Sequence, residues 1–264
     1  MSRVVLLTGG TSGIGLCTAR ALARKDCRVY TLSRRGGEGE QNIVHLQADI
    51  TREEQISAAV ETVLQRERSI DIVINNAGFG ISGAVEFTDT AEARKQFDVN
   101  FFGMVRVNRI LLPILRQQGH GRIVNISSVA GPIPIPFQAY YSAAKAAIDS
   151  YTLSLQNEVR PFGISVCAVR PGDIRTGFTA AREKSALGDD VYGGRISRSV
   201  ATMEKDEQGG MDPAAAGSFI CRAALMPRSR PLLTIGVQYQ LFCLIVKLLP
   251  RRFTNWLVGL IYAR

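Results

Sequence analysis

The sequence predicts an α/β fold: a single domain in which helices cover both faces of a doubly wound parallel sheet. Short apolar runs such as Val4 to Leu7, typical of strands buried on both faces, alternate with amphipathic stretches of helical length. A glycine-rich turn, Thr8 to Gly15, stands between that first run and a helix-forming stretch at 16–24. The length of 264 residues suits one large domain, residues 1–264, and shows no internal repeat.

Further elements follow in the same alternation. Each short apolar run predicts a strand, at 28–32, 43–47, 71–74, 163–169 and 232–236. Apolar residues at three- and four-residue spacing predict helices at 52–68, 90–116 and 139–159, and Asp212-Pro213 begins a short helix that ends near 225. The charged, glycine-rich residues 177–211 show no clear periodicity, so they are either a lid or binding loop or a plain surface loop.

Composition and net charge limit the kinds of molecule that the protein is expected to bind. The chain is 46% hydrophobic and 21% charged, and its net charge of +9 suits a nucleic acid, an anionic membrane surface or a phosphorylated cofactor. We expect no nucleic acid, because basic and aromatic residues form no interleaved stripe. Five cysteines without a CxxC pair, with only His45 and His120 besides, predict free thiols and no metal site. Since no signal peptide and no apolar run of about 20 residues occurs, we expect a cytoplasmic protein.

The glycine-rich turn predicts a dinucleotide site. Glycines let the backbone turn tightly and approach a pyrophosphate, which binds the free N–H groups at the helix start. The residues expected there are Gly9, Thr11, Ser12, Gly13, Ile14 and Gly15.

The end of the second strand run predicts which dinucleotide binds. It carries Ser33, Arg34 and Arg35, and no acid that could hold a ribose 2′-hydroxyl occurs between Asp26 and Glu38. Guanidinium groups attract a 2′-phosphate, so NADP(H) is favoured over NAD(H). The alternative is that both arginines merely belong to a solvated loop.

A tyrosine and a lysine four residues apart provide candidate acid–base chemistry. On the expected helix at 139–159, Tyr141 and Lys145 share one face, which brings the ammonium close to the phenol. A free tyrosine has a pKa of about 10, too high for acid–base catalysis at neutral pH. A fixed cation nearby favours the phenolate, so we expect Lys145 to lower the pKa of Tyr141. Most such pairs are ordinary surface contacts, and the function therefore depends on the surrounding motifs.

Seven motifs in a fixed order carry a family resemblance. They are Thr8 to Gly15, Asp49, Asn75 to Gly78, Asn100, Ser128, Tyr141 to Lys145, and Pro171-Gly172 through Thr176. With these motifs, the sequence from Val4 to about Thr176 resembles the short-chain dehydrogenase/reductase family. The resemblance implies a Rossmann-type fold, an enzyme that oxidises or reduces CH–OH groups with a nicotinamide cofactor, and a partly helical, mobile substrate lid at about 177–211.

The resemblance implies four catalytic residues: Asn100, Ser128, Tyr141 and Lys145. Tyr141 would exchange a proton with the substrate oxygen, and Ser128 would hydrogen-bond that oxygen. Asn100 would join a water-borne proton relay. Ser127 competes with Ser128, and Tyr140 with Tyr141, but the thirteen-residue spacing and the lysine four residues on favour the second of each pair. We expect no catalytic role for either histidine.

The resemblance also extends the cofactor site along the chain. Asp49 and Ile50 would contact the adenine, and Asn76 would support the ribose side. Lys145 would hold the nicotinamide ribose, and Thr176 would bind the nicotinamide amide. Further cofactor contacts are implied for Ala77, Gly78, Tyr141, Pro171, Gly172 and Ile174.

The C-terminal extension, at about 237–264, is strongly apolar. Its apolar stretches at 239–249 and 253–262 are separated by Pro250-Arg251-Arg252. One interpretation is packing against the domain or a neighbouring subunit. The other is that it covers an apolar substrate cleft or rests on a membrane surface, since basic residues beside apolar faces fit interfacial binding.

These observations lead to one primary hypothesis and two alternatives. We expect an NADP(H)-dependent oxidoreductase that interconverts a ketone and a secondary alcohol on a lipophilic substrate such as a hydroxysteroid, in a cleft lined by Ile81 and residues 129–137. The chain looks more like the hydroxysteroid and retinol dehydrogenase-like branch than like 3-oxoacyl reductases, which are the first alternative. The second is a non-catalytic NADP-binding sensor. Because family members are usually oligomers, a homodimer or homotetramer is expected.

Overall fold

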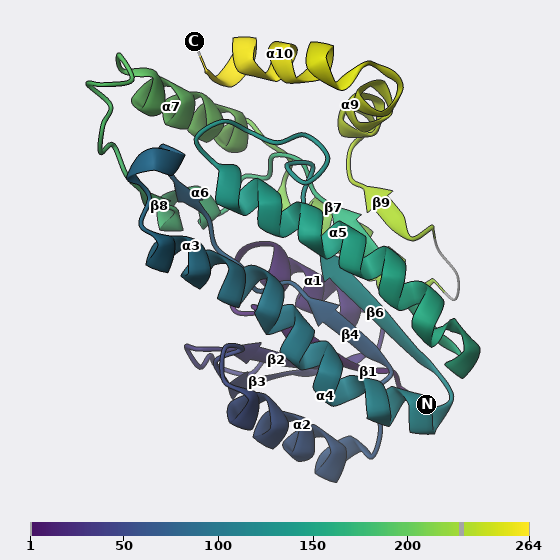
Figure 1. Ribbon diagram of the computed structural model, residues 1–264. Helices are drawn as coiled ribbons and strands as arrows, with labels where there is room; N and C mark the ends of the chain where they lie inside the picture. The colour runs from purple at the N-terminus through teal and green to yellow at the C-terminus, as the bar shows by residue number, and fades with distance from the viewer. Residues whose placement is uncertain (1, 227–229, 264) are drawn as a thin grey trace.

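The computed structural model describes residues 2–226 and 230–263, which form a seven-stranded parallel sheet in the order β3-β2-β1-β4-β6-β7-β9 (Figure 1). The order reverses at β1, between β2 and β4, and in sheets of this type the ligand crevice lies at the carboxyl ends of the strands around that reversal. The strands are β1 Val4–Thr8, β2 Arg28–Ser33, β3 Ile43–Gln47, β4 Ile72–Asn75, β6 Gly121–Ile126, β7 Ile164–Arg170 and β9 Leu232–Thr234.

Helices cover both faces of the sheet, as the sequence predicts. Helices α1 (Gly13–Ala23) and α8 (Pro213–Leu225) contribute to one core, while α2 (Glu53–Glu67), α4 (Gly103–Gln118) and α5 (Ala139–Val159) contribute to the other. Figure 1 shows α4 and α5 in front of the sheet and α1 behind it. Successive strand residues alternate between the two cores, so that Val5 and Leu7 of β1 face the first and Val4 and Leu6 face the second.

A close contact between α8 and α1 fixes the helix that follows the glycine turn. A Cβ atom at Gly217 would lie 2.6 Å from the carbonyl carbon of Cys17 and 2.7 Å from the backbone nitrogen of Thr18. No side chain fits at that distance, so glycine lets the backbones of the two helices approach directly. The start of α1, where the glycine turn ends, is thereby held against the body of the domain.

Most predicted elements are confirmed within one or two residues, but two predictions need correction. Strand β6 lies in the centre of the sheet, paired with β4 and β7, and no strand was predicted there. Its apolar residues are interrupted by Arg122 and Asn125, both buried, which weakens the apolar signal.

The single helix predicted at 90–116 is in fact interrupted. Helix α3 (Thr90–Phe97) passes through a π-helical turn at Asp98–Phe102 into α4. This wider π-helical turn contains Asn100, which is buried and hydrogen-bonded to the backbone of Phe79. π-Turns inside helices are rare and frequently occur at functional sites.

Residues 177–211 are partly helical, in agreement with the prediction. They contain α6 (Phe178–Ala181) and α7 (Arg195–Gln208), and β8 (Glu183–Lys184) pairs in parallel with β5 (Ile81–Ser82). Short 3-10 helices at Val85–Phe87 and Arg160–Phe162 complete the connections.

The C-terminal extension forms two helices outside the sheet, α9 (Val237–Leu248) and α10 (Arg251–Tyr262). In Figure 1, α10 lies beside α7 at the edge of the molecule. The hydroxyl of Tyr262 donates a hydrogen bond to Asp206 Oδ2 of α7 at 3.0 Å, and that of Tyr239 on α9 donates to Asp173 Oδ2 at 2.6 Å. Among the described residues, no helix combines the length and apolarity needed to cross a bilayer.

Candidate active site

A cleft of about 1360 Å³ opens at the carboxyl ends of the central strands. The predicted cofactor and catalytic residues converge on it from segments that are far apart in sequence. Of the predicted catalytic and cofactor-binding residues, Asn100 alone does not line this cleft. The predicted residues that do are Gly9, Thr11, Ser12, Gly13, Ile14, Gly15, Ser33, Arg34, Arg35, Asp49, Ile50, Asn76, Ala77, Gly78, Ser128, Tyr141, Lys145, Pro171, Gly172, Ile174 and Thr176.

The glycine turn has the geometry that a pyrophosphate requires. Gly9 and Gly13 adopt positive φ angles of 71° and 52°, in a region that favours glycine. A Cβ at Gly15 would lie 2.0 Å from the carbonyl oxygen of Gly9, so any side chain would force the turn open. The Ser12 side chain makes no capping hydrogen bond and the first turn of α1 has no acid, which leaves the positive helix end suited to an anion. These residues therefore fit a dinucleotide.

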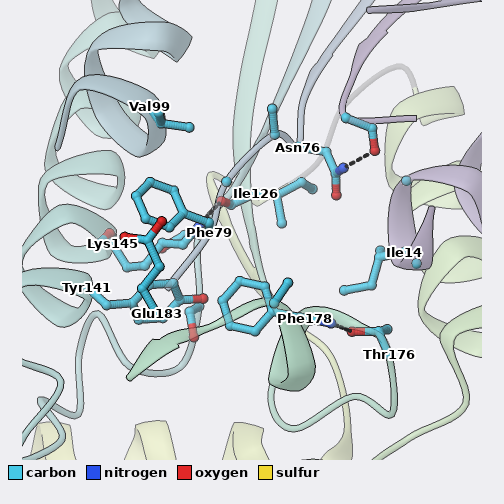
Figure 2. Close-up of a pocket in the computed structure, with 18 of the residues that line it drawn as sticks. Ile14, Asn76, Phe79, Val99, Ile126, Tyr141, Lys145, Thr176, Phe178 and Glu183 are labelled. Carbon is cyan, nitrogen blue, oxygen red and sulfur yellow. Dashed lines mark hydrogen bonds between the residues drawn. The ribbon is translucent and has the colours of Figure 1, made fainter. Parts of the chain in front are cut away.

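Asn76 supports this turn from the neighbouring strand. Its amide Nδ2 donates to the carbonyl oxygens of Thr8 at 3.1 Å and Gly9 at 3.0 Å, and Figure 2 marks one hydrogen bond at Asn76 with a dashed line. The Thr8 hydroxyl in turn accepts from the backbone nitrogens of Asn76 at 3.0 Å and Ala77 at 3.1 Å. The Asn76 side chain therefore holds the glycine turn in shape, and its support of the ribose stays a prediction.

The structure distinguishes Ser128 from Ser127, the other candidate for the catalytic serine. Ser127 is buried and its hydroxyl donates to the carbonyl oxygen of Lys145 at 3.0 Å, a bond between β6 and α5. Ser128 follows it into the cleft, where its Oγ accepts from the Ala130 nitrogen at 3.1 Å and is close enough to Tyr141 to influence the pKa of the phenol. Of the two tyrosines, only Tyr141 has this partner and the lysine: Lys145 Nζ lies 5.5 Å from the Tyr141 ring centroid.

Burial dominates the pKa values of the pair. Burial raises the pKa of Tyr141 to about 12, although the hydrogen bond with Ser128 acts in the opposite direction. Burial also lowers the pKa of Lys145 to about 8, while the charge of Asp149 opposes the shift. The ammonium donates to the carbonyl oxygen of Ile126 at 2.8 Å. The expected lowering of the tyrosine pKa is therefore not found, because the loss of hydration around the phenolate exceeds the lowering effects of Ser128 and of the Arg182 charge.

The lysine pKa gives a testable pH dependence. Below pH about 8 Lys145 carries its charge, and above it the amine is neutral. Because that charge favours an anionic oxygen nearby, we expect kcat/KM for carbonyl reduction to fall as the pH rises through about 8. Stopped-flow or steady-state rates from pH 6 to about 10 would measure this limb. A Lys145→Arg enzyme keeps its charge over this range and should lose the limb; an unchanged limb would assign the titration to another group.

Asn100 acts on the cleft through Phe79. Its Oδ1 accepts from the Phe79 nitrogen at 3.0 Å, and its Nδ2 donates to the Phe79 carbonyl oxygen at 2.8 Å. The side chain is 2% exposed, and Phe79 itself lines the cleft. The contact holds the loop after β4 in place, and the proton relay stays a prediction.

The substrate end of the cleft combines apolar and acidic groups. Phe178 lies beside Tyr141, with the ring centroids 5.8 Å apart and the ring planes tilted by 57° (Figure 2). Other residues that line this end are Val129, Ile135, Asp173, Met203, Glu207 and Tyr262. Ile81, predicted to line the cleft, is instead buried in β5, where its nitrogen donates to Gln96 Oε1 at 2.9 Å.

Five of these lining residues had no individual prediction, among them Met203 of α7. Asp173 lies within the predicted Pro171–Thr176 motif, so the sequence could have indicated that it lines the cleft. Phe178, Glu207 and Tyr262 come from the lid and the extension, and no periodicity or motif marks them in the sequence. Glu207 forms an ion pair with Arg182, whose side chain is fully buried, and accepts from the Thr179 hydroxyl at 2.6 Å.

The fold and the site together define an oxidoreductase that acts on CH–OH groups with a nicotinamide dinucleotide. The family described as short chain dehydrogenase matches residues 3–186, and the chain belongs to it. A "3-ketodihydrosphingosine reductase" of Bacteroides thetaiotaomicron is 38% identical over 231 residues, which cover 87% of this chain and 85% of that protein.

Solved structures agree with this assignment. A short-chain dehydrogenase from Streptomyces avermitilis superposes with a TM-score of 0.85 at 30% identity, covering 97% of this chain and 96% of that one. ElxO with NADP bound has a TM-score of 0.75 at 26% identity, with 91% and 99% covered. A 3-ketoacyl-(acyl-carrier-protein) reductase from Brucella melitensis complexed with NADH has a TM-score of 0.71 at 26% identity, with 88% and 96% covered. Relatives with this fold thus bind either nicotinamide cofactor.

Proposed function

We propose that this protein is an NADP(H)-dependent reductase of a long-chain lipid ketone that carries an amino group beside the carbonyl. 3-Ketodihydrosphingosine is the type compound. The observation that carries the proposal is the combination, at the end of a dinucleotide cleft, of the Tyr141–Ser128 pair with an apolar wall and two carboxylates. The substrate named for the Bacteroides relative has both chemical features, an alkyl chain and an amine.

The reaction needs a proton donor and a holder of the carbonyl oxygen. A bound nicotinamide cofactor supplies the hydride to the carbonyl carbon. Tyr141 is protonated at neutral pH, because its pKa is raised to about 12, and donates its proton to the carbonyl oxygen. Ser128 hydrogen-bonds the same oxygen and stabilises the negative charge that develops there. Lys145 is positively charged below pH about 8, so it also stabilises the negative charge on the carbonyl oxygen.

The carboxylates favour an amine over a neutral steroid. Asp173 and Glu207 both line the cleft, and the charge of each acts on Tyr141. Arg182 forms an ion pair with Glu207, whereas Asp173 Oδ2 accepts from the uncharged Tyr239 hydroxyl and the charge of Arg182 acts on Asp173 only as a weaker influence. Burial raises the pKa of Asp173, while the hydrogen bond with Tyr239 acts in the opposite direction. An ammonium beside the ketone would give this half-buried carboxylate a close counter-charge, which a hydroxysteroid does not offer.

Two arginines support the NADP(H) preference. Arg34 and Arg35 line the cleft at the end of β2 and are exposed, and the second strand carries no acid in their place. A ribose 2′-phosphate would meet two guanidinium groups there, and each can form paired hydrogen bonds with a phosphate.

A 3-oxoacyl thioester reductase is the second candidate. The Brucella structure carries that name, and Val129 and Ile135 provide an apolar wall for an acyl chain. The carboxylates separate the two candidates, since a 3-oxoacyl thioester has no cation near its ketone. A non-catalytic sensor is not favoured, because Ser128, Tyr141 and Lys145 all stand in place around the cleft.

The test measures reduction of three ketones with purified enzyme: 3-ketodihydrosphingosine, a 3-oxoacyl thioester and a steroid ketone, each with NADPH and NADH. We expect the highest kcat/KM with the amino ketone and NADPH. Preference for the thioester would transfer the assignment to the second candidate, and preference for the steroid would restore the hydroxysteroid hypothesis. Tight NADPH binding without turnover of any ketone would favour a sensor.

Removing the charge of Asp173 should lower activity on the amino ketone selectively. Asp173→Asn keeps the shape of the side chain but removes its charge. We expect kcat/KM for the amino ketone to fall by about 10- to 100-fold, the usual range for one charge-assisted hydrogen bond. A matched long-chain 3-ketone without the amine should be affected less than about threefold. Equal losses on both ketones would show that Asp173 acts on the protein, through Tyr239, instead of on the amine.

A further inference from the structure

The C-terminal helices expose an unusual amount of apolar surface. On α10, Trp256 is 56% exposed and Ile261 is 53% exposed, and on α9, Leu248 is 74% exposed. The other large exposed apolar residues of the segment are Val237, Leu241, Phe242, Leu244, Leu249, Phe253 and Leu257. A folded domain normally buries such residues or uses them to bind a partner.

On both helices these residues gather on one face. On α9, Val237, Leu241, Leu244 and Leu248 recur at three- and four-residue spacing, the repeat of a single helical stripe. On α10, exposed residues at 253, 256, 257 and 261 repeat in the same way.

The opposite faces of these helices contact the protein. On α10, Tyr262 lies on the side away from Phe253 and bonds to Asp206 of α7, while the buried Thr254 lies at the border of the stripe, seven residues before Ile261. On α9, Tyr239 bonds to Asp173 and lies against Gly172, where a Cβ would come within 2.2 Å of its ring. The helices are therefore docked through one face and present the apolar stripe outward.

Positive charge borders the apolar stripes. Lys247, Arg251 and Arg252 are exposed at the end of α9 and the start of α10, next to Leu248 and Phe253. After Asp212 the sequence contains no aspartate or glutamate. An apolar stripe with basic residues at its border is the composition of a helix that lies in the headgroup region of an anionic bilayer.

We propose that α9 and α10 bind the surface of an anionic phospholipid bilayer, with both helices lying in the plane of the membrane.

A second copy of the chain is a less suitable partner for this surface than a bilayer. A symmetric contact would bring the basic groups of two such segments together, with no acid in either segment to pair with them, on chains that each carry a net charge of +9. Tyr262 lines the cleft from the end of α10, so the bound surface borders the substrate entrance.

The single tryptophan makes the test specific. Trp256 lies within the exposed stripe of α10, and the chain contains no other tryptophan. Purified full-length protein is titrated with phosphatidylglycerol–phosphatidylcholine vesicles and with pure phosphatidylcholine vesicles. We expect a blue shift of tryptophan emission and co-sedimentation with the anionic vesicles, and at least tenfold weaker binding to the neutral ones.

Two variants and a control separate the apolar and charged contributions. Phe253→Asp with Ile261→Asp should abolish vesicle binding. Arg251→Gln with Arg252→Gln should weaken binding to anionic vesicles by about 30-fold, because each basic residue near such a surface contributes roughly fivefold. Phe162→Asp alters an apolar residue that is 43% exposed before β7, at the amino end of the strands, and should bind normally. Circular dichroism and NADPH binding without vesicles confirm that each variant is folded.

Three outcomes would overturn the proposal. The first is the absence of any blue shift with anionic vesicles, and the second is equal binding by the wild-type protein and the folded Phe253→Asp/Ile261→Asp variant. The third is a blue shift that depends on protein concentration without lipid, together with dimers in sedimentation that the same variant dissociates. That result would assign the stripe to a second copy. None of these readouts uses substrate turnover, so they are independent of the proposed reaction.

Discussion

A Tyr141→Phe enzyme is expected to lose about 10³-fold in kcat while it binds the cofactor as tightly as the wild type. Phenylalanine keeps the buried ring and its contact with Phe178, but it has no proton to donate and no hydroxyl for Ser128. The measurements are single-turnover hydride transfer and NADPH titration.

Tyr140→Phe is the matched control, because Tyr140 is adjacent in the same helix and also lines the cleft. It should retain activity within about threefold of the wild type. If Tyr140→Phe were the inactive variant and Tyr141→Phe remained active, the catalytic assignment on α5 would have to move by one residue.

Replacing both cleft arginines should reverse the cofactor preference. In Arg34→Asp/Arg35→Ser, the 2′-phosphate loses two guanidinium partners and meets a carboxylate, whereas a free 2′-hydroxyl gains an acceptor. We expect the ratio of NADPH to NADH affinity to fall by about 100-fold or more. Fluorescence titration with each cofactor at two salt concentrations measures it, and the wild-type preference should weaken at high salt.

Arg66→Ser is the control for a general effect of charge. Arg66 is an exposed arginine near the end of α2 and does not line the cleft. Its loss should leave the ratio unchanged. If Arg34→Asp/Arg35→Ser also left the ratio of NADPH to NADH affinity unchanged, Arg34 and Arg35 would belong to a solvated loop that binds no phosphate.

The sequence predicted the fold well because this fold is built from local patterns. A strand buried on both faces needs a short apolar run, and a pyrophosphate turn needs glycines at fixed positions, as at Gly9 and Gly15. Both signals are contained within about ten residues of chain. The motif residues also converge on the cleft as expected, since the carboxyl ends of parallel strands share one edge of the sheet.

What the sequence did not reveal depends on contacts between distant segments. Strand β6 was missed because its buried Arg122 and Asn125 find partners that only the folded sheet provides, such as Thr152 for Asn125 at 2.9 Å. The π-turn around Asn100 depends on a bond to Phe79, which lies on another segment. Likewise, helix spacing placed Lys145 near Tyr141 correctly but could not show how deeply both are buried, and burial sets the direction of the pKa shifts.

The contact between Gly172 and Tyr239 has a thermodynamic consequence. The loop that carries the expected cofactor contacts at Ile174 and Thr176 rests, through that contact, on the helix α9 that we assign to the bilayer. If membrane docking shifts this loop, it changes the affinity for the cofactor by some factor. Reciprocity then requires that the cofactor change the affinity for vesicles by the same factor. The fraction of protein that holds the cofactor and the distribution of the protein between water and membrane would then depend on each other.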